Sequence, residues 1–124
     1  MNHIIVAVML CSAVCHPDQI AVWDGDTFLL GASGHHEKIR IANIDTAEIE
    51  GRCESETALA FRARERLAQL LEGQQVSIHR RGSDKYGRTL ATIRVNGADV
   101  GDLLVREELA RVWTGRRLPW CDGR

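Results

Sequence analysis

The alternation of apolar and polar residues predicts three short β-strands in the first third of the chain. They are expected at 19–23 (QIAVW), 27–30 (TFLL) and 38–44 (KIRIANI). In the third run, isoleucines alternate with an outward Arg40, which is the period of a half-buried strand. The first two strands are joined by the turn-forming Asp24-Gly25-Asp26, and residues 31–37 are expected to form a loop or hairpin tip.

After the third strand the hydrophobic period changes to that of a helix. Leu59, Ala63 and Leu67 recur every four residues, while arginines line the other side. Acidic residues in the first turn favour a helix N-terminus, and Gly73 favours its end. A long helix over 54–71 is therefore predicted.

The rest of the chain predicts two strands, a short helix and an irregular tail. The segments are 75–80 (QVSIHR), 89–95 (TLATIRV), a helix from about Val100 to Glu107, and the tail 116–124 (RRLPWCDGR). The order β-β-β-α-β-β-α fits an α+β fold, a five-stranded barrel with one long and one short helix packed outside. A chain of 124 residues suffices for one such domain, expected over 18–124.

Residues 1–15 (MNHIIVAVMLCSAVC) are open to two interpretations. The apolar run has signal-peptide length and is followed by the small residues Ser12 and Ala13, but no Lys or Arg precedes it. It is too short to span a membrane, so no stable membrane insertion is expected. We favour an export signal, and hence a periplasmic or extracellular protein, over a buried first strand; a cytoplasmic location stays open.

Four cysteines bear on the same question. Cys11 and Cys15 have a C-x3-C spacing, but no second close pair or histidine cluster completes a zinc set. Cys53 and Cys121 lie far apart, and Cys121 sits in a short tail that needs anchoring. We therefore prefer a Cys53–Cys121 disulfide, with free thiols in a reducing cytosol as the alternative.

Charge is distributed unevenly along the chain. The overall net charge of −1 argues against a general basic coat for nucleic acid. Residues 18–56 hold nine acids against three cations, whereas residues 80–124 hold ten cations against six acids. The two halves could fold into a cation site beside an anion site, or the charges could simply be solvated.

The acidic residues lie where predicted strands end. Asp26 and Asp45 each follow an apolar run, and a barrel could bring them together. Two carboxylates with a main-chain oxygen suit Ca²⁺ better than zinc. Arg40 and Arg88 could clamp a phosphodiester beside such a cation, although surface ion pairs are the ordinary role of arginines.

Several motifs occur together in a fixed order. DGDT at 24–27, Arg40 followed by Asp45-Thr46 and Glu48, a long helix, and DKYGR at 84–88 are spaced as in one known family. Over about residues 20–113 the chain resembles the staphylococcal nuclease (thermonuclease) family. The resemblance implies an OB-fold barrel and a Ca²⁺-dependent nuclease that hydrolyses DNA or RNA, leaving 3′-phosphate ends.

The resemblance also implies roles for individual residues. The matching positions are Asp26, Asp45 and the Thr46 carbonyl as calcium ligands, Asp24 in the metal's outer shell, Glu48 as general base, Arg40 and Arg88 on the phosphate, and Lys85 and Tyr86 on a terminal phosphate. A carboxylate three residues beyond Asp45 is well placed to orient a metal-adjacent water. We expect a monomeric enzyme.

The chain also departs from the family pattern. Ala47 stands where the family commonly has Pro, and the segment before the helix is short and bears Cys53. Trp113 replaces the tyrosines that stack on the nucleotide base, and it could equally be a core residue. The tail GRRLPWC resembles that of short bacterial members, in which a terminal Trp-Cys ties down the end.

Two rival interpretations stay open. One is an inactive OB-fold module that binds nucleic acid or a protein partner, although such a copy would be expected to have lost a site residue. The other is a secreted protein in which the acids bind calcium only for stability. Minor candidates are a metal role for the adjacent His35 and His36, and a DNA-facing role for Arg62, Arg64 and Arg66.

Overall fold

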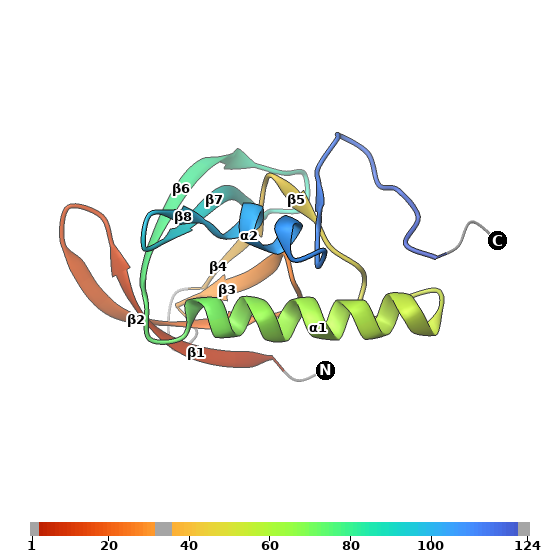
Figure 1. Ribbon diagram of the computed structural model, residues 1–124. Helices are drawn as coiled ribbons and strands as arrows, with labels where there is room; N and C mark the ends of the chain where they lie inside the picture. The colour runs from red at the N-terminus through yellow and green to blue at the C-terminus, as the bar shows by residue number, and fades with distance from the viewer. Residues whose placement is uncertain (1–2, 32–35, 122–124) are drawn as a thin grey trace.

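The centre of the fold is a closed β-barrel, seen in a computed structural model that describes residues 3–31 and 36–121 (Figure 1). The strands are β1 (Ile4–Cys11), β2 (Cys15–Val22), β3 (Thr27–Leu30), β4 (Glu37–Ile41), β5 (Ile44–Asp45), β6 (Gln75–Ser83), β7 (Thr89–Val95), β8 (Ala98–Asp99) and β9 (Arg111–Val112). The sheet order is β4-β3-β2-β1-β6-β7-β8, and a parallel β4–β7 pairing closes the ring. β5 pairs separately with β9.

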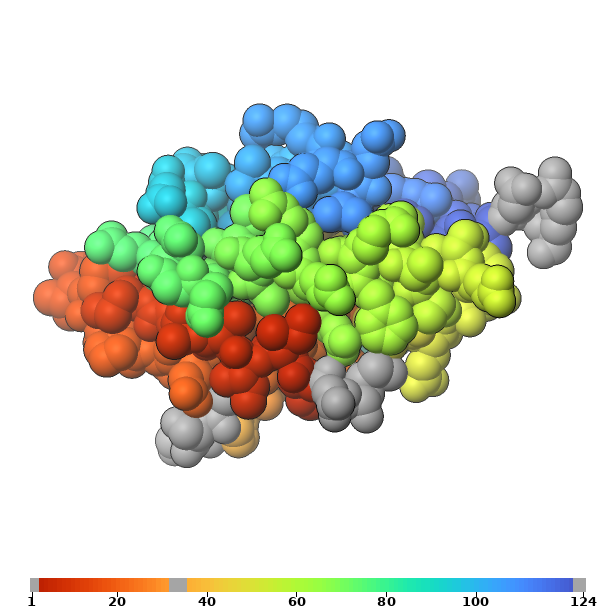
Figure 2. Space-filling view, turned by 60° about the horizontal axis from the view of Figure 1, so that its bottom comes forward, coloured from red at the N-terminus to blue at the C-terminus, as the bar shows by residue number. Residues whose placement is uncertain are grey.

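Two helices pack outside the barrel. α1 (Glu54–Leu71) buries Leu67 and Leu71 against the core, and α2 (Val100–Arg106) is capped by Asp99, which accepts a hydrogen bond from the Asp102 main-chain N–H at 3.0 Å. In the space-filling view α1 lies between the N-terminal hairpin and the segment of α2 (Figure 2). In the described ranges, no helix is long and apolar enough to cross a membrane.

The core residues come from alternate positions of the strands and one face of each helix. Its fully buried large side chains include Ile20, Val22, Phe28, Ile39, Ile41, Ile44, Leu67, Leu71, Val76, Ile93, Val100 and Leu104. This pattern matches the period-two alternation from which the strands were predicted. The α+β barrel with outer helices is confirmed.

Some predicted boundaries are wrong in an informative way. The strand expected over 38–44 is interrupted at Ala42 and Asn43, so β4 ends at Ile41 and β5 begins at Ile44. The Arg40 guanidinium donates to the carbonyls of Ile41 and Ile44. Because these carbonyls are engaged by a side chain, the chain turns here instead of continuing as a strand.

The N-terminal segment adds a strand to the ring. β1 pairs along its whole length with β2 and, at its end, in parallel with β6. Val6 and Val8 lie in the core. The ring therefore contains one strand more than the five expected, and in the folded chain the segment behaves as the first strand. Removal of this segment as an export signal stays a prediction.

All four cysteines are paired. Cys53 and Cys121 form the favoured disulfide, and Cys11 and Cys15 form a second one, which the sequence analysis did not predict. Cys11 and Cys15 are opposite one another in the β1–β2 register, so the hairpin brings their side chains together. Within the predicted loop 31–37, residues 32–35, which include His35, lie outside the described residues.

Candidate active site

The turn between β2 and β3 and the end of β5 bring the two acidic stretches into contact. The Asp26 carboxylate accepts a hydrogen bond from the Thr46 main-chain N–H at 3.0 Å. The Asp26 carbonyl accepts one from the Ile41 main-chain N–H at 2.7 Å. Asp24 accepts a hydrogen bond from the Asp26 N–H at 3.0 Å, which fixes the turn.

Gly25 allows this turn to approach α1. A Cβ atom at Gly25 would lie 2.7 Å from the Ala63 Cβ and 2.8 Å from the Thr46 Cγ2. Real Cβ atoms do not make contacts this close, so a side chain here would push the turn away from the helix. Gly25 therefore lets the turn pack closely against α1 and Thr46, and this packing sets the positions of the Asp24 and Asp26 carboxylates.

Arg40 lies between the two acids. Its guanidinium nitrogens are 3.6 Å from an Asp26 oxygen and 3.8 Å from an Asp45 oxygen. As predicted, Arg40 is not part of the hydrophobic core of the barrel. It is nevertheless buried and not exposed, because only 8% of the residue is accessible. Trp113 covers it, with its ring centroid 5.5 Å from the guanidinium carbon.

Glu48 is exposed and meets an arginine from the tail. An oxygen of its carboxylate lies 2.7 Å from Arg117 Nη2. The same guanidinium contacts the Asp45 carboxylate at 3.0 Å and donates to the Thr46 carbonyl at 3.3 Å. Arg117 thus contacts three of the groups assigned to the metal and the base, and the sequence analysis did not identify it.

Glu56 supports the loop that carries Glu48. It is buried in the first turn of α1, where its carboxylate accepts hydrogen bonds from the main-chain N–H groups of Glu48 at 3.2 Å and Arg52 at 3.0 Å. This arrangement resembles a capping box, in which an acidic side chain satisfies N–H groups ahead of the helix. Glu56 therefore fixes the backbone on which Glu48 stands.

Arg88 lies near Asp24, one of the acids of the site. Its guanidinium pairs with the Asp84 carboxylate at 2.7 Å, and its predicted phosphate role stays a prediction. Arg88 and Asp24 both line a hollow of about 190 Å³, together with Trp23, Thr27 and Lys38. The fold thus brings a second predicted arginine to the rim of the acidic site.

Lys85 and Tyr86 belong to the exposed turn before β7. Tyr86 is 71% exposed, and its ring lies under both the Lys85 ammonium and the Arg88 guanidinium, at 5.4 and 5.6 Å from the centroid. The Tyr86 main-chain N–H donates to the Asp84 carboxylate at 2.9 Å, but within the described ranges neither residue is placed in contact with Asp24, Asp26 or Asp45. Their predicted role on a terminal phosphate stays a prediction.

Burial and neighbouring negative charge raise the pKa values of Asp24 and Asp45. Burial and the neighbouring Asp26 carboxylate raise the pKa of Asp24 to about 8. Burial also raises the pKa of the Asp45 carboxyl, although Arg117 and Arg40 act in the opposite direction. Additional positive charge at this position would favour the ionised carboxylates.

The donor atoms fit a hard cation. The carboxylates of Asp26 and Asp45 and the Thr46 carbonyl are oxygen ligands of the kind that Ca²⁺ takes. The Thr46 hydroxyl is buried with no hydrogen-bond partner among the described residues, so a polar ligand would satisfy it. Asp24 is half-buried next to this set and suits the outer shell.

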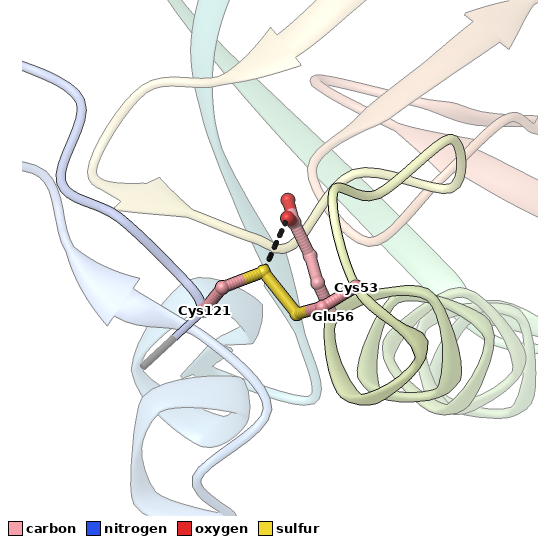
Figure 3. A group of neighbouring side chains, drawn as sticks. All are labelled: Cys53, Glu56 and Cys121. Carbon is pink, nitrogen blue, oxygen red and sulfur yellow. Dashed lines mark hydrogen bonds between the residues drawn. A yellow bond between two sulfur atoms is a disulfide. The ribbon is translucent and has the colours of Figure 1, made fainter. Parts of the chain in front are cut away.

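A separate group of possible ligand atoms lies at the tail. Cys53, Glu56 and Cys121 have these atoms within 4.8 Å of one another, and they are the one set of three so close in the described ranges (Figure 3). The Cys121 sulfur is 3.5 Å from a Glu56 oxygen. Because both sulfurs belong to a disulfide, they carry neither proton nor thiolate charge, so this contact is packing and no metal site.

A known protein family matches most of this chain. Residues 38–119, well over half of the chain, match the family described as staphylococcal nuclease homologue. The chain belongs to this family. The matched range contains Arg40, Asp45, Glu48 and Arg88, and it also contains Arg117. For this staphylococcal nuclease homologue the predicted family resemblance is confirmed.

The micrococcal nuclease of Shigella flexneri is a similar protein. It is 35% identical to this staphylococcal nuclease homologue over 74 residues, which are 60% of this chain and 39% of the relative. The chain therefore spans about two fifths of the length of that relative.

Proposed function

We propose that this protein is a Ca²⁺-dependent nuclease that hydrolyses phosphodiester bonds of DNA, RNA or both. The observation that carries the proposal is the meeting of Asp26, Arg40 and Asp45, three residues from separate elements with the charges that phosphodiester hydrolysis requires. The family, and the name of the Shigella relative, support nuclease activity.

The cation would be held by Asp26, Asp45 and the Thr46 carbonyl, with Asp24 outside them. When bound, it supplies positive charge for a phosphate oxygen and for the attacking water. Glu48 orients or deprotonates that water. Arg40 and Arg88 bind the remaining phosphate oxygens, where charge gathers in the transition state.

The finer parts of the proposal concern product and substrate. Hydrolysis leaves 3′-phosphate ends, as the family resemblance implies. Lys85 and Tyr86 contact a terminal phosphate of the bound nucleotide from their exposed turn. The exposed face of Trp113, which is 38% accessible, stacks on a base, since an aromatic ring stacks on any base.

Digestion assays test the activity. Single- and double-stranded DNA and RNA are incubated with the protein in Ca²⁺ and then in excess EDTA, and cleavage is expected only in Ca²⁺. Glu48→Gln should lower kcat by about 10²- to 10⁴-fold, because the amide cannot accept the proton. The matched control is Glu50→Gln, an exposed neighbour that should retain activity.

The outcomes separate the alternatives. Undiminished cleavage by Glu48→Gln would reject Glu48 as the base. Nucleic-acid binding without cleavage in Ca²⁺ would favour the inactive OB-fold module. The end groups of the products, read with a 3′-phosphatase, test the predicted cleavage direction.

We also propose that the protein works as a monomer in an oxidising compartment, periplasmic or extracellular. The Cys53–Cys121 disulfide, which lies outside residues 1–15, supports this location, because such bonds persist where thiols are not kept reduced. The intact mass of the non-reduced protein isolated from its host tests disulfide state and removal of residues 1–15 together. Light scattering tests the monomer.

A further inference from the structure

The tail arginine is the residue of this site that most needs an explanation. Arg117 contacts the Asp45 carboxylate, the Thr46 carbonyl and the Glu48 carboxylate through one guanidinium. The first two are proposed ligands of the cation. The positive charge of the guanidinium repels a calcium ion at the same groups, so the two oppose one another there.

The acids are arranged around arginines rather than around a common point. Asp26 and Asp45 both face Arg40, and Asp45 also faces Arg117. A cation bound by Asp45 and Thr46 would therefore compete with Arg117 for these groups.

The tail provides both a tether and room for this movement. Four residues after Arg117, Cys121 is bonded to Cys53 ahead of α1, on the loop that also carries Glu48 (Figure 3). Arg117 and Glu48 line a hollow of about 630 Å³, and 44% of the Arg117 side chain is accessible. The guanidinium can turn outward while the disulfide holds its backbone nearby.

We propose that Arg117 is a positioning residue, a tethered positive charge that competes with the cation for Asp45 and Thr46 and restrains Glu48 until it is displaced. The disulfide sets how often the guanidinium returns, because it fixes the local concentration of the tail. The inference deepens the proposed function and rests on it in one respect, namely that the cation binds these oxygens.

Calorimetric titration of Ca²⁺ into the metal-free protein tests the competition. A competitor lowers apparent affinity by the fraction of molecules in which it occupies the site. Arg117→Gln should therefore tighten the Kd for Ca²⁺ by about fivefold, given a half-exposed ion pair. Arg116→Gln, at the exposed neighbouring position, should leave the Kd unchanged.

Thermal unfolding separates competition from a structural role. Arg117→Gln should lower Tm in EDTA, where the guanidinium balances the acids, and should leave Tm unchanged in saturating Ca²⁺. A purely structural arginine would lower Tm in both conditions and would weaken Ca²⁺ binding, and that result would overturn the inference.

The tether is tested by a double-mutant cycle. Cys53→Ala with Cys121→Ala should tighten Ca²⁺ binding toward the value of Arg117→Gln, and combining all three changes should add little further. Cys11→Ala with Cys15→Ala, in the distant hairpin, is the matched control. Circular dichroism checks that each variant is folded.

The titration also distinguishes this inference from the proposed function. Equal Ca²⁺ affinity in the wild type and Arg117→Gln would overturn the competition and leave the nuclease proposal standing. Failure of every folded variant to bind Ca²⁺ would overturn the calcium site of the proposed function and the competition together.

Discussion

At the scale of single residues, Arg40 links the path of the chain to the charge of the site. Its guanidinium faces two buried carboxylates and donates to two main-chain carbonyls, one on each side of the break between β4 and β5. The same side chain therefore ends a strand and balances Asp26 and Asp45. Its removal should be felt in stability as well as in activity.

Arg40→Met should lower the free energy of unfolding by about 3 kcal/mol in EDTA, because it leaves two buried carboxylates without their guanidinium. Urea unfolding measures the change. Arg81→Met, at an exposed position on β6, is the control and should cost little. A loss at Arg40 no larger than the control would show that the acids do not depend on it.

Residue-scale prediction succeeded where the signal was local. Asp26 and Asp45 end apolar runs, and the structure places both at one guanidinium. Arg117 was missed because its contact depends on where the tail runs. The predicted Cys53–Cys121 disulfide could have indicated this contact, because it places the residues just before Cys121 against the loop after Glu48.

At the scale of elements, α1 and the strands differ in how far the sequence determines their ends. α1 has the predicted bounds because its period, its acidic first turn and the following Gly73 are all local signals. β4 ends early because the Arg40 side chain, drawn to Asp26 and Asp45, donates to the carbonyls of Ile41 and Ile44. β9 was not predicted, since two residues that pair with β5 leave no periodic pattern.

The start of α1 depends on Glu56. Glu56→Gln should lower the free energy of unfolding by about 1–2 kcal/mol, because the amide replaces a charged acceptor of two main-chain N–H groups with a weaker one. Glu54→Gln, exposed in the same turn, is the matched control. Equal losses in thermal unfolding would assign the effect to the helix dipole rather than to the loop before the helix.

The Glu37–Arg80 pair gives β4 and β6 a pH-dependent connection. Two hydrogen bonds from Arg80 and one from Thr89 hold the pKa of Glu37 below its ordinary value of 4.5. A lowered pKa means that the stabilisation is present above pH 4.5 and is lost as the pH falls through the folded-state pKa.

Glu37→Gln should therefore cost about 1 kcal/mol near pH 7 and almost nothing below about pH 3. Urea unfolding of the wild type and the variant across this range measures the difference. A difference that stays constant with pH would show that the carboxylate charge is not its source.

At the scale of the whole molecule, the uneven charge left open a cation site beside an anion site or scattered solvated charge, and the structure pairs charges from the two halves. Arg80 pairs with Glu37, and Arg117 with Asp45 and Glu48, so late cations meet early acids. Ring closure was harder to predict, because an apolar run at the N-terminus suits an export signal and a strand equally well.

A chain beginning at Pro17 tests the contribution of β1. If β1 closes the ring between β2 and β6, its removal exposes their edges and uncovers the core around Val6 and Val8, so Tm should fall by at least 10 °C. Differential scanning calorimetry measures this shift. A truncated chain as stable as the full one would favour the export-signal interpretation of residues 1–15.

The Cys11–Cys15 disulfide in the β1–β2 hairpin has a consequence for the growing polypeptide. Cys121 follows Cys53 by 68 positions, so during synthesis Cys53 emerges well before its partner. In that interval the thiols within its reach are those of Cys11 and Cys15, and their union in the hairpin withdraws both from exchange. The Cys11–Cys15 disulfide thus keeps Cys53 from pairing with Cys11 or Cys15 before Cys121 is available. Oxidative refolding of a chain without Cys15 should therefore trap isomers with non-native disulfides.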